Sequence, residues 1–141
     1  WFPEKPKQQL MLELTERDAL PDMDYRVVRE LHQMGVQLAI DDFGTGYTSY
    51  ARLKSVDADI LKIDGSFIRN IVNNSLDYQI VASICHLARM KKMLVVAEYV
   101  ETEEIRSAVH ALGIDYVQGY LIGRPVALAS LLEAEASVAD A

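Results

Sequence analysis

The sequence predicts an α/β fold in which strands and helices alternate along 141 residues. Five short apolar segments begin near residues 9, 36, 60, 93 and 116. Successive segments are therefore about 23 to 33 residues apart, which is the length of one strand–helix unit. The segments are continuous apolar runs without in/out alternation, as is typical of parallel strands covered on both faces. This order indicates a parallel sheet with helices packed against it.

The first three strands are predicted at residues 9–14, 36–40 and 60–63. Each of these segments is short and apolar and leads into polar or glycine residues, which is the usual pattern of a buried strand. A helix is predicted over 22–34, where apolar side chains recur at helical spacing and Gly35 provides a C-terminal stop. A shorter helix is expected near 49–54.

The last two strands are predicted at residues 93–97 and 116–118. Further helices are predicted at residues 66–72, 75–92, 103–112 and 127–136. The first of these is expected to have only one or two turns. The helix over 103–112 stops at Gly113, and the last helix is rich in alanine and leucine.

An open doubly wound sheet and an arc of a (β/α)8 barrel both fit this order of elements. A doubly wound nucleotide-binding fold usually has a glycine-rich phosphate loop after its first strand. The residues at that position are Leu14, Thr15, Glu16 and Arg17. Because they include no glycine, the barrel is favoured.

The composition argues against several functional classes. Acidic residues outnumber basic ones by 21 to 14, which gives a net charge of −7, and this argues against binding to a nucleic-acid polymer. The single cysteine, Cys85, excludes an internal disulfide and fits a cytoplasmic location. No apolar run approaches the roughly 20 residues of a membrane span, so we expect no membrane contact from this segment.

Titratable or metal-binding side chains stand at the carboxyl ends of the predicted strands. They are Glu13, Asp41, Asp42, Lys62, Asp64, Glu98 and Gln118. In a parallel barrel all of these ends lie at one face, where barrel enzymes have their active sites. Carboxylates gathered there repel one another, and Mg²⁺ or Mn²⁺ would relieve this repulsion. The pattern therefore predicts an acidic metal centre.

Some of these acidic residues also have a simpler interpretation. Asp42 and Asp64 precede loop residues and could serve as ordinary helix caps. Lys62 favours the shared site more strongly, because an ammonium group inside an apolar strand is costly to bury unless acids pair with it. His32, His86 and His110 fall in predicted helices, and we interpret them as structural or exposed.

Five motifs follow one another along most of the chain. They are Leu12-Glu13-Leu14-Thr15-Glu16, Ile40-Asp41-Asp42-Phe43-Gly44-Thr45-Gly46-Tyr47, Leu61-Lys62-Ile63-Asp64, Ala97-Glu98-Tyr99-Val100-Glu101-Thr102 and Gln118-Gly119-Tyr120. In this order and spacing the sequence resembles the EAL-domain cyclic di-GMP phosphodiesterases. The resemblance implies a modified (β/α)8 TIM barrel that hydrolyses cyclic di-GMP to pGpG with two Mg²⁺ or Mn²⁺ ions.

The resemblance also implies a role for each motif residue. Glu13, Asp41, Asp42 and Glu98 would hold metal ions, and Glu98 is also the usual candidate for the general base. Lys62 would contact the hydrolytic water or a phosphate oxygen. Supporting roles, in substrate binding or in bracing a loop, would fall to Glu16, Asp64, Glu101 and Gln118.

Two positions depart from the family pattern. Tyr99 stands where the family usually has glycine, and Tyr50 stands where it more often has leucine. If that glycine takes a positive φ or lies close to the substrate, Tyr99 strains the loop or crowds the guanine base.

The family's namesake Glu-Ala-Leu motif and an asparagine ligand precede the matched motifs, so the resemblance implies that residues 1–141 form a partial EAL domain. About five of the eight strand–helix units of the barrel would be present. We therefore expect the isolated chain to be inactive. The open sheet edges predict a homo-oligomer or completion by the missing barrel strands.

Two other functions remain open at this stage. A degenerate EAL domain would act as a regulatory module that binds cyclic di-GMP or a protein, and Tyr99 motivates this alternative. A Mg²⁺-dependent barrel enzyme of the enolase type also pairs strand-end carboxylates with a lysine. The segments Phe43-Gly44-Thr45-Gly46 and Gln118-Gly119-Tyr120 argue against the enolase type.

Overall fold

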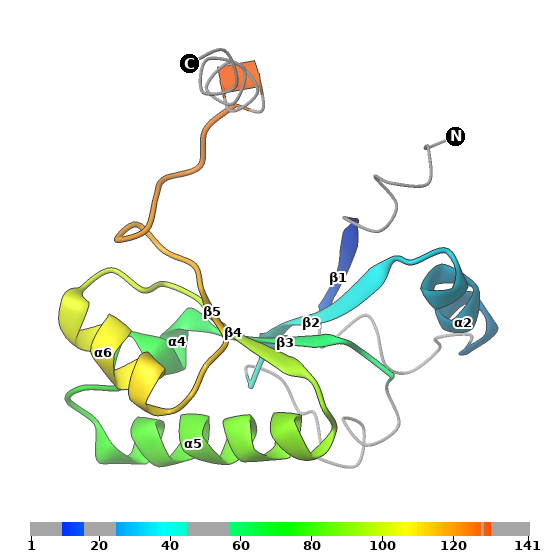
Figure 1. The fold of residues 1–141 in the computed structure, drawn as a ribbon. Helices are drawn as coiled ribbons and strands as arrows, with labels where there is room; N and C mark the ends of the chain where they lie inside the picture. Colours follow the sequence, from blue (N-terminus) through cyan, green and yellow to red (C-terminus); the bar gives the residue numbers. More distant parts are fainter. Residues whose placement is uncertain (1–9, 16–24, 45–56, 128, 131–141) are drawn as a thin grey trace.

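The strands within the described residues form one parallel sheet. The computed structural model describes residues 10–15, 25–44, 57–127, 129 and 130, and Figure 1 shows their arrangement. The strands are β1 (Met11–Thr15), β2 (Gln37–Phe43), β3 (Ile60–Ile63), β4 (Leu94–Ala97) and β5 (Tyr116–Val117). They lie side by side in chain order, and every neighbouring pair is parallel. A doubly wound sheet reverses its strand order, so this order agrees with the predicted arc of a barrel.

The helices alternate with the strands as expected. They are α2 (Tyr25–Gln33), α4 (Gly65–Ile68), α5 (Ser75–Met90) and α6 (Glu103–Ala111). The predicted α/β class is confirmed, with small differences at the ends of elements. The predicted helix at 49–54 and most of that at 127–136 lie outside the described residues. None of the helices in the described part has the length and apolar character needed to cross a membrane.

One difference from the predicted elements, at the end of β2, bears directly on the site. The predicted strand ended at Ile40, but β2 continues through Asp41 and Asp42 to Phe43. The prediction was wrong because consecutive aspartates are depleted in strands, and pairing with β3 overrides that weak local preference.

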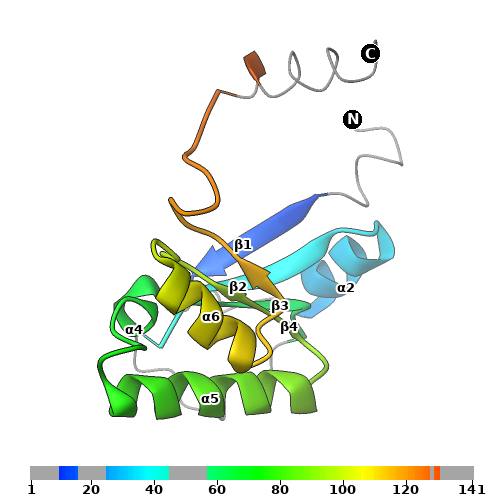
Figure 2. The same ribbon diagram turned by 60° about the vertical axis from the view of Figure 1, so that its left-hand side comes forward.

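One face of the sheet packs against helices. Leu61 and Ile63 of β3 are fully buried in a core that includes residues of α4, α5 and α6. Figures 1 and 2 show these three helices gathered on the same side of the sheet. Ile60 and Lys62 alternate with these residues and therefore point to the opposite face. The charged end of that second face is where the candidate site lies.

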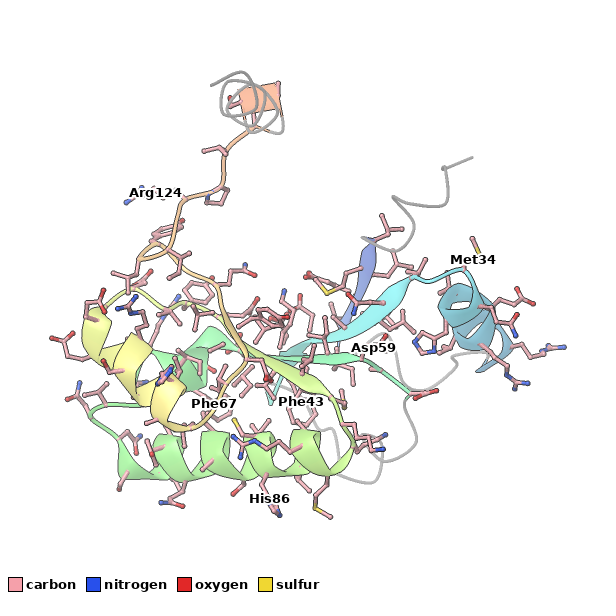
Figure 3. The ribbon with its side chains drawn as sticks, viewed as in Figure 1. Met34, Phe43, Asp59, Phe67, His86 and Arg124 are labelled. Atoms are coloured by element: carbon pink, nitrogen blue, oxygen red, sulfur yellow. The ribbon has the colours of Figure 1, made fainter. Side chains whose placement is uncertain are left out.

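Local sequence signals define several helix ends. Asn74 and Thr102 cap α5 and α6 with side-chain oxygens that accept hydrogen bonds from backbone N–H groups of the first turn. Gly35 and Gly113, the predicted stops, have φ values of 79° and 69°. His86 on α5 is exposed and points away from the sheet (Figure 3), in agreement with the sequence interpretation.

The chain after β5 crosses directly over Val100. Val100 donates its N–H to the carbonyl oxygen of Gln118 at 3.0 Å, and Leu121 donates to the carbonyl oxygen of Val100 at 3.2 Å. A Cβ atom at Gly119 would overlap the backbone N and O atoms of Val100. Because Gly119 has no side chain, the backbone can approach closely and bring Gln118 beside the end of β4.

Replacing Gly119 by alanine is expected to lower the free energy of unfolding by about 1 to 3 kcal/mol, because the new methyl group must displace the backbone it overlaps. Gly123→Ala is the matched control, since no atom lies within 4 Å of a Cβ at that position. Urea denaturation measures both variants. Equal midpoints for the two variants would contradict the close packing of Gly119 on Val100.

Candidate active site

A β-bulge brings the two aspartates of β2 to the same site. The register of β2 against β3 shifts between Ile40 and Phe43, so Asp41 and Asp42 together lie opposite Lys62. Consecutive side chains of a regular strand point to opposite faces, but a bulge turns one of them. Asp42 has a φ of 54°, a left-handed conformation that aspartate adopts more readily than most residues. Both carboxylates can therefore serve one centre.

The ammonium group of Lys62 lies at the middle of this centre. Its Nζ atom is 2.9 Å from Glu13 Oε1, from Asp41 Oδ1 and from Glu98 Oε1. These acids stand on β1, on β2 and directly after β4, so residues from both sides of β3 converge. The side chain of Lys62 is only 5% exposed, and its charge would be costly to bury without these partners. The predicted pairing of a buried Lys62 with acids is confirmed.

The pKa values of Lys62 and Glu98 are both raised, but for different reasons. Burial by itself lowers the pKa of Lys62, but contacts with Asp41, Glu98 and Glu13 raise it well above the ordinary value of 10.5. Burial raises the pKa of Glu98, the contact with Lys62 offsets part of this rise, and the charges of Asp41 and Asp42 add to it. Lys62 therefore stays charged at neutral pH, whereas Glu98 holds a proton more readily than an ordinary glutamate.

Three carboxylates of this centre are close enough to share a cation. Asp41, Asp42 and Glu98 each offer an oxygen atom, and these atoms lie within 4.8 Å of one another. Asp41 Oδ1 is buried and accepts no well-directed hydrogen bond from the described residues, although Lys62 Nζ is 2.9 Å away. Together with Glu13, the centre contains four carboxylates and one ammonium group. Hard oxygen ligands with excess negative charge fit a divalent cation such as Mg²⁺ or Mn²⁺.

A cavity of about 410 Å³ opens beside these carboxylates. It is lined by Asp41, Asp42, Lys62, Asp64, Glu98, Tyr99, Glu101, Gln118, Gly119 and Tyr120. Glu13 is absent from this lining but contacts Lys62 directly. The structure thus brings together every predicted site residue except Glu16, which lies outside the described residues.

Two residues that line the cavity, Asp64 and Tyr120, add to what the sequence predicted for the site. Asp64 Oδ1 accepts a hydrogen bond from the N–H of Ser66 at 2.8 Å and caps α4, so its simpler interpretation as a helix cap is correct. Tyr120 was not predicted as a site residue. Its place in the motif Gln118-Gly119-Tyr120 was the available signal in the sequence, but it enters the cavity because the chain crosses Val100 at Gly119. That close contact joins distant parts of the sequence, so local patterns could not reveal it.

Comparison with known proteins tests the resemblance that the motifs carry. The sequence model described as EAL domain matches residues 3–125. The chain belongs to the EAL domain family. It is 70% identical over 126 residues to cyclic di-GMP phosphodiesterase PdeF of Escherichia coli (strain K12), and the alignment covers 88% of this chain and 17% of PdeF. The family resemblance is therefore confirmed, and the enolase-type alternative is wrong.

Solved EAL structures share the fold of this chain. The PaMucR phosphodiesterase in complex with c-di-GMP is 42% identical, with a TM-score of 0.79 over 89% of this chain and 51% of that one. The manganese and cy-diGMP complex of BlrP1 from Klebsiella pneumoniae is 35% identical, with a TM-score of 0.79 over 84% of this chain and 31% of that one. EAL domains are TIM barrels, so the predicted barrel class is confirmed. The chain spans about half of the PaMucR structure and a smaller share of PdeF and BlrP1.

Replacing Lys62 by methionine is expected to lower the free energy of unfolding by about 3 kcal/mol at pH 7, because the buried carboxylates lose their counter-charge. The loss should be smaller at pH 5, because without the ammonium group the pKa of Glu98 rises further and this carboxylate becomes protonated more readily. In the unsubstituted chain the contribution of Lys62 is fully present below pH 10.5 and is lost only as the pH rises through its raised pKa.

Arg106→Met is the matched control for this substitution. Arg106 pairs with Glu103 at 2.7 Å, but the two side chains are 54% and 62% exposed, so the expected loss is below about 1 kcal/mol. Urea denaturation at both pH values measures the two variants. A loss for Lys62→Met that is as small as that of the control at pH 7 would contradict the central role of the ammonium group.

Proposed function

We propose that this chain provides catalytic and metal-binding groups of a phosphodiesterase that hydrolyses cyclic di-GMP to pGpG. The observation that carries the proposal is one buried ammonium group with four carboxylates at one end of the sheet, beside an open cavity. Family membership supports the reaction, because PdeF is named a cyclic di-GMP phosphodiesterase and PaMucR is described in complex with c-di-GMP.

The carboxylates are the groups that would hold the metal ions. We assign Glu13, Asp41, Asp42 and Glu98 as ligands of Mg²⁺ or Mn²⁺. The buried Oδ1 atom of Asp41 and the short distances among Asp41, Asp42 and Glu98 support this assignment, and Glu13 contacts the same ammonium group of Lys62. The manganese complex of BlrP1 supports this choice. Bound divalent ions supply charge neutralisation at the phosphodiester and lower the pKa of water at the site.

Lys62 and Glu98 then have distinct chemical tasks. A water molecule attacks one phosphorus atom, and Glu98 accepts its proton; burial raises the pKa of this carboxylate, which suits a general base. Lys62 donates a hydrogen bond to a phosphate oxygen or to the water. The new bond joins phosphorus to the water oxygen, and the bond from phosphorus to the 3′ oxygen breaks. The 3′ oxygen takes up a proton from solvent, Glu98 later releases the proton that it accepted, and linear pGpG forms. Glu101, Gln118 and Asp64 line the space for the substrate.

The face of the sheet opposite α4, α5 and α6 is relevant to how the site is completed. Beside the strands lies an open hollow of about 810 Å³, lined by apolar residues such as Ile60, Leu94 and Val96. We propose that residues 1–141 are a partial EAL domain and that further barrel strands, or a second copy of the chain, cover this face. A cytoplasmic location remains a prediction from the single cysteine.

A regulatory module that binds cyclic di-GMP without turnover is the second candidate. Tyr99 favours it, because this residue lines the cavity beside Glu98 and has a φ of 55°. This positive φ corresponds to the first of the two possibilities that the sequence left open for Tyr99, a strained loop. The intact contact between Glu98 and Lys62 at 2.9 Å nevertheless supports the enzyme.

The proposed enzyme is tested in a chimera in which this chain replaces its matched 126 residues in PdeF. We expect the chimera to hydrolyse cyclic di-GMP with Mn²⁺ and not with EDTA. Glu98→Gln should lower kcat at least about a hundredfold, the contribution of a general base. Glu103→Gln, at an exposed carboxylate on α6, should leave it unchanged. Chromatography of pGpG measures the rates.

The outcomes of this assay separate the two candidates. A folded chimera that binds cyclic di-GMP without hydrolysis supports the regulatory module. A folded chimera that does neither contradicts both proposals.

The isolated chain of 141 residues is expected to form no pGpG above background with Mn²⁺, because the proposed site needs ligands from the remaining barrel strands. Chromatography under the same conditions as for the chimera provides the measurement, with PdeF as the positive control. Robust hydrolysis by the isolated chain would show that these further strands are not required.

A further inference from the structure

Tyr99 combines three features that the proposed reaction does not use. Its backbone is in the left-handed region at a φ of 55°, which is unfavourable for a bulky side chain. It directly follows Glu98 and lines the cavity that contains the carboxylates. It is nevertheless 45% exposed. A strained residue persists only where its surroundings hold it, so the contacts of its ring indicate what it does.

The ring of Tyr99 is held in place by α4. Gly65, the first residue of α4, has no side chain, and a Cβ atom there would overlap Cδ2 of the Tyr99 ring. Arg69 at the end of α4 places its guanidinium carbon 4.1 Å from the ring centroid, a cation–π contact. Gly65 and Arg69 therefore fix the ring at one wall of the cavity, while Tyr99 as a whole remains 45% exposed.

The position of the Tyr99 ring in the cavity suits the binding of a nucleotide. The carboxylates in the same cavity would bind the phosphate through cations, so a base attached to that phosphate must lie near the rim. An aromatic ring held beside a phosphate site is a stacking surface for a nucleobase, which it recognises by its flat π-face.

We propose that Tyr99 is a specificity-determining residue whose exposed ring stacks on a purine base of the substrate, with Arg69 and Gly65 holding the ring in place. This inference rests on the proposed function, because it takes the carboxylates as the phosphate end of the same site. It assigns a binding task to one of the two residues at which this sequence departs from the family pattern.

The test compares two competitive inhibitors of the chimera, guanosine 5′-monophosphate and ribose 5-phosphate. Both have a phosphorylated ribose, and only the first has a purine. In Tyr99→Leu the inhibition constant for guanosine 5′-monophosphate should rise about tenfold, the usual effect of losing one stacked base, and that for ribose 5-phosphate should stay the same. Tyr99→Phe keeps the ring and should restore the preference for the purine ligand.

Two further variants separate stacking from backbone strain. Tyr99→Gly relieves the unfavourable φ and removes the ring, so stacking predicts the same loss of purine preference as in Tyr99→Leu. Leu76→Ala, at a residue that is 66% exposed on α5, is the control and should change neither constant.

Three results would overturn the inference. The first is an equal change for both inhibitors in Tyr99→Leu, and the second is a purine preference that survives in Tyr99→Gly. In both cases the unsubstituted chimera still hydrolyses cyclic di-GMP, so the proposed function stands. An unsubstituted chimera that is folded but inactive overturns the proposed function itself, and this inference with it.

Discussion

The contact of one buried ammonium group with three carboxylates is the interaction on which the rest of the site depends. Lys62 is on β3, the central strand of the sheet, and reaches acids that belong to β1, β2 and the end of β4. Without its charge, Glu13, Asp41 and Glu98 would repel one another in a poorly hydrated space. Lys62 therefore positions the acids. Because one ammonium group neutralises only part of their charge, the centre keeps the excess negative charge that a site for divalent cations requires.

The bulge in β2 is the second constraint, because it determines how many acids one strand can contribute. A regular strand would direct Asp41 and Asp42 to opposite faces, and one of the two would then face the apolar core. The register shift and the positive φ of Asp42 let both contribute to the cluster with Glu98. The local backbone cost at Asp42 is therefore part of the site.

The sequence was sufficient to predict the strand–helix order and the convergence of strand ends, because both follow from apolar periodicity and parallel topology. It did not reveal the bulge, since two aspartates after an apolar run look like the start of a loop. Nor did it reveal the packing of Tyr99 on Gly65, because that contact joins residues far apart in the chain. Asp64 shows a further limit: it caps α4 and also lines the cavity, and the sequence pattern alone could not tell whether one or both of these positions would be found.

Tyr99 also bears on the choice between an enzyme and a regulatory module. A bulky residue in a left-handed conformation would argue for a degenerate site if it displaced the neighbouring carboxylate of Glu98. The structure shows the reverse: with the ring packed against Gly65, Glu98 remains 8% exposed and 2.9 Å from Lys62. The strain is taken up in the backbone of Tyr99 and balanced by its contacts with α4. The contact between Glu98 and Lys62 and the packed ring of Tyr99 are therefore compatible, so a tyrosine at this position does not by itself argue for a degenerate site.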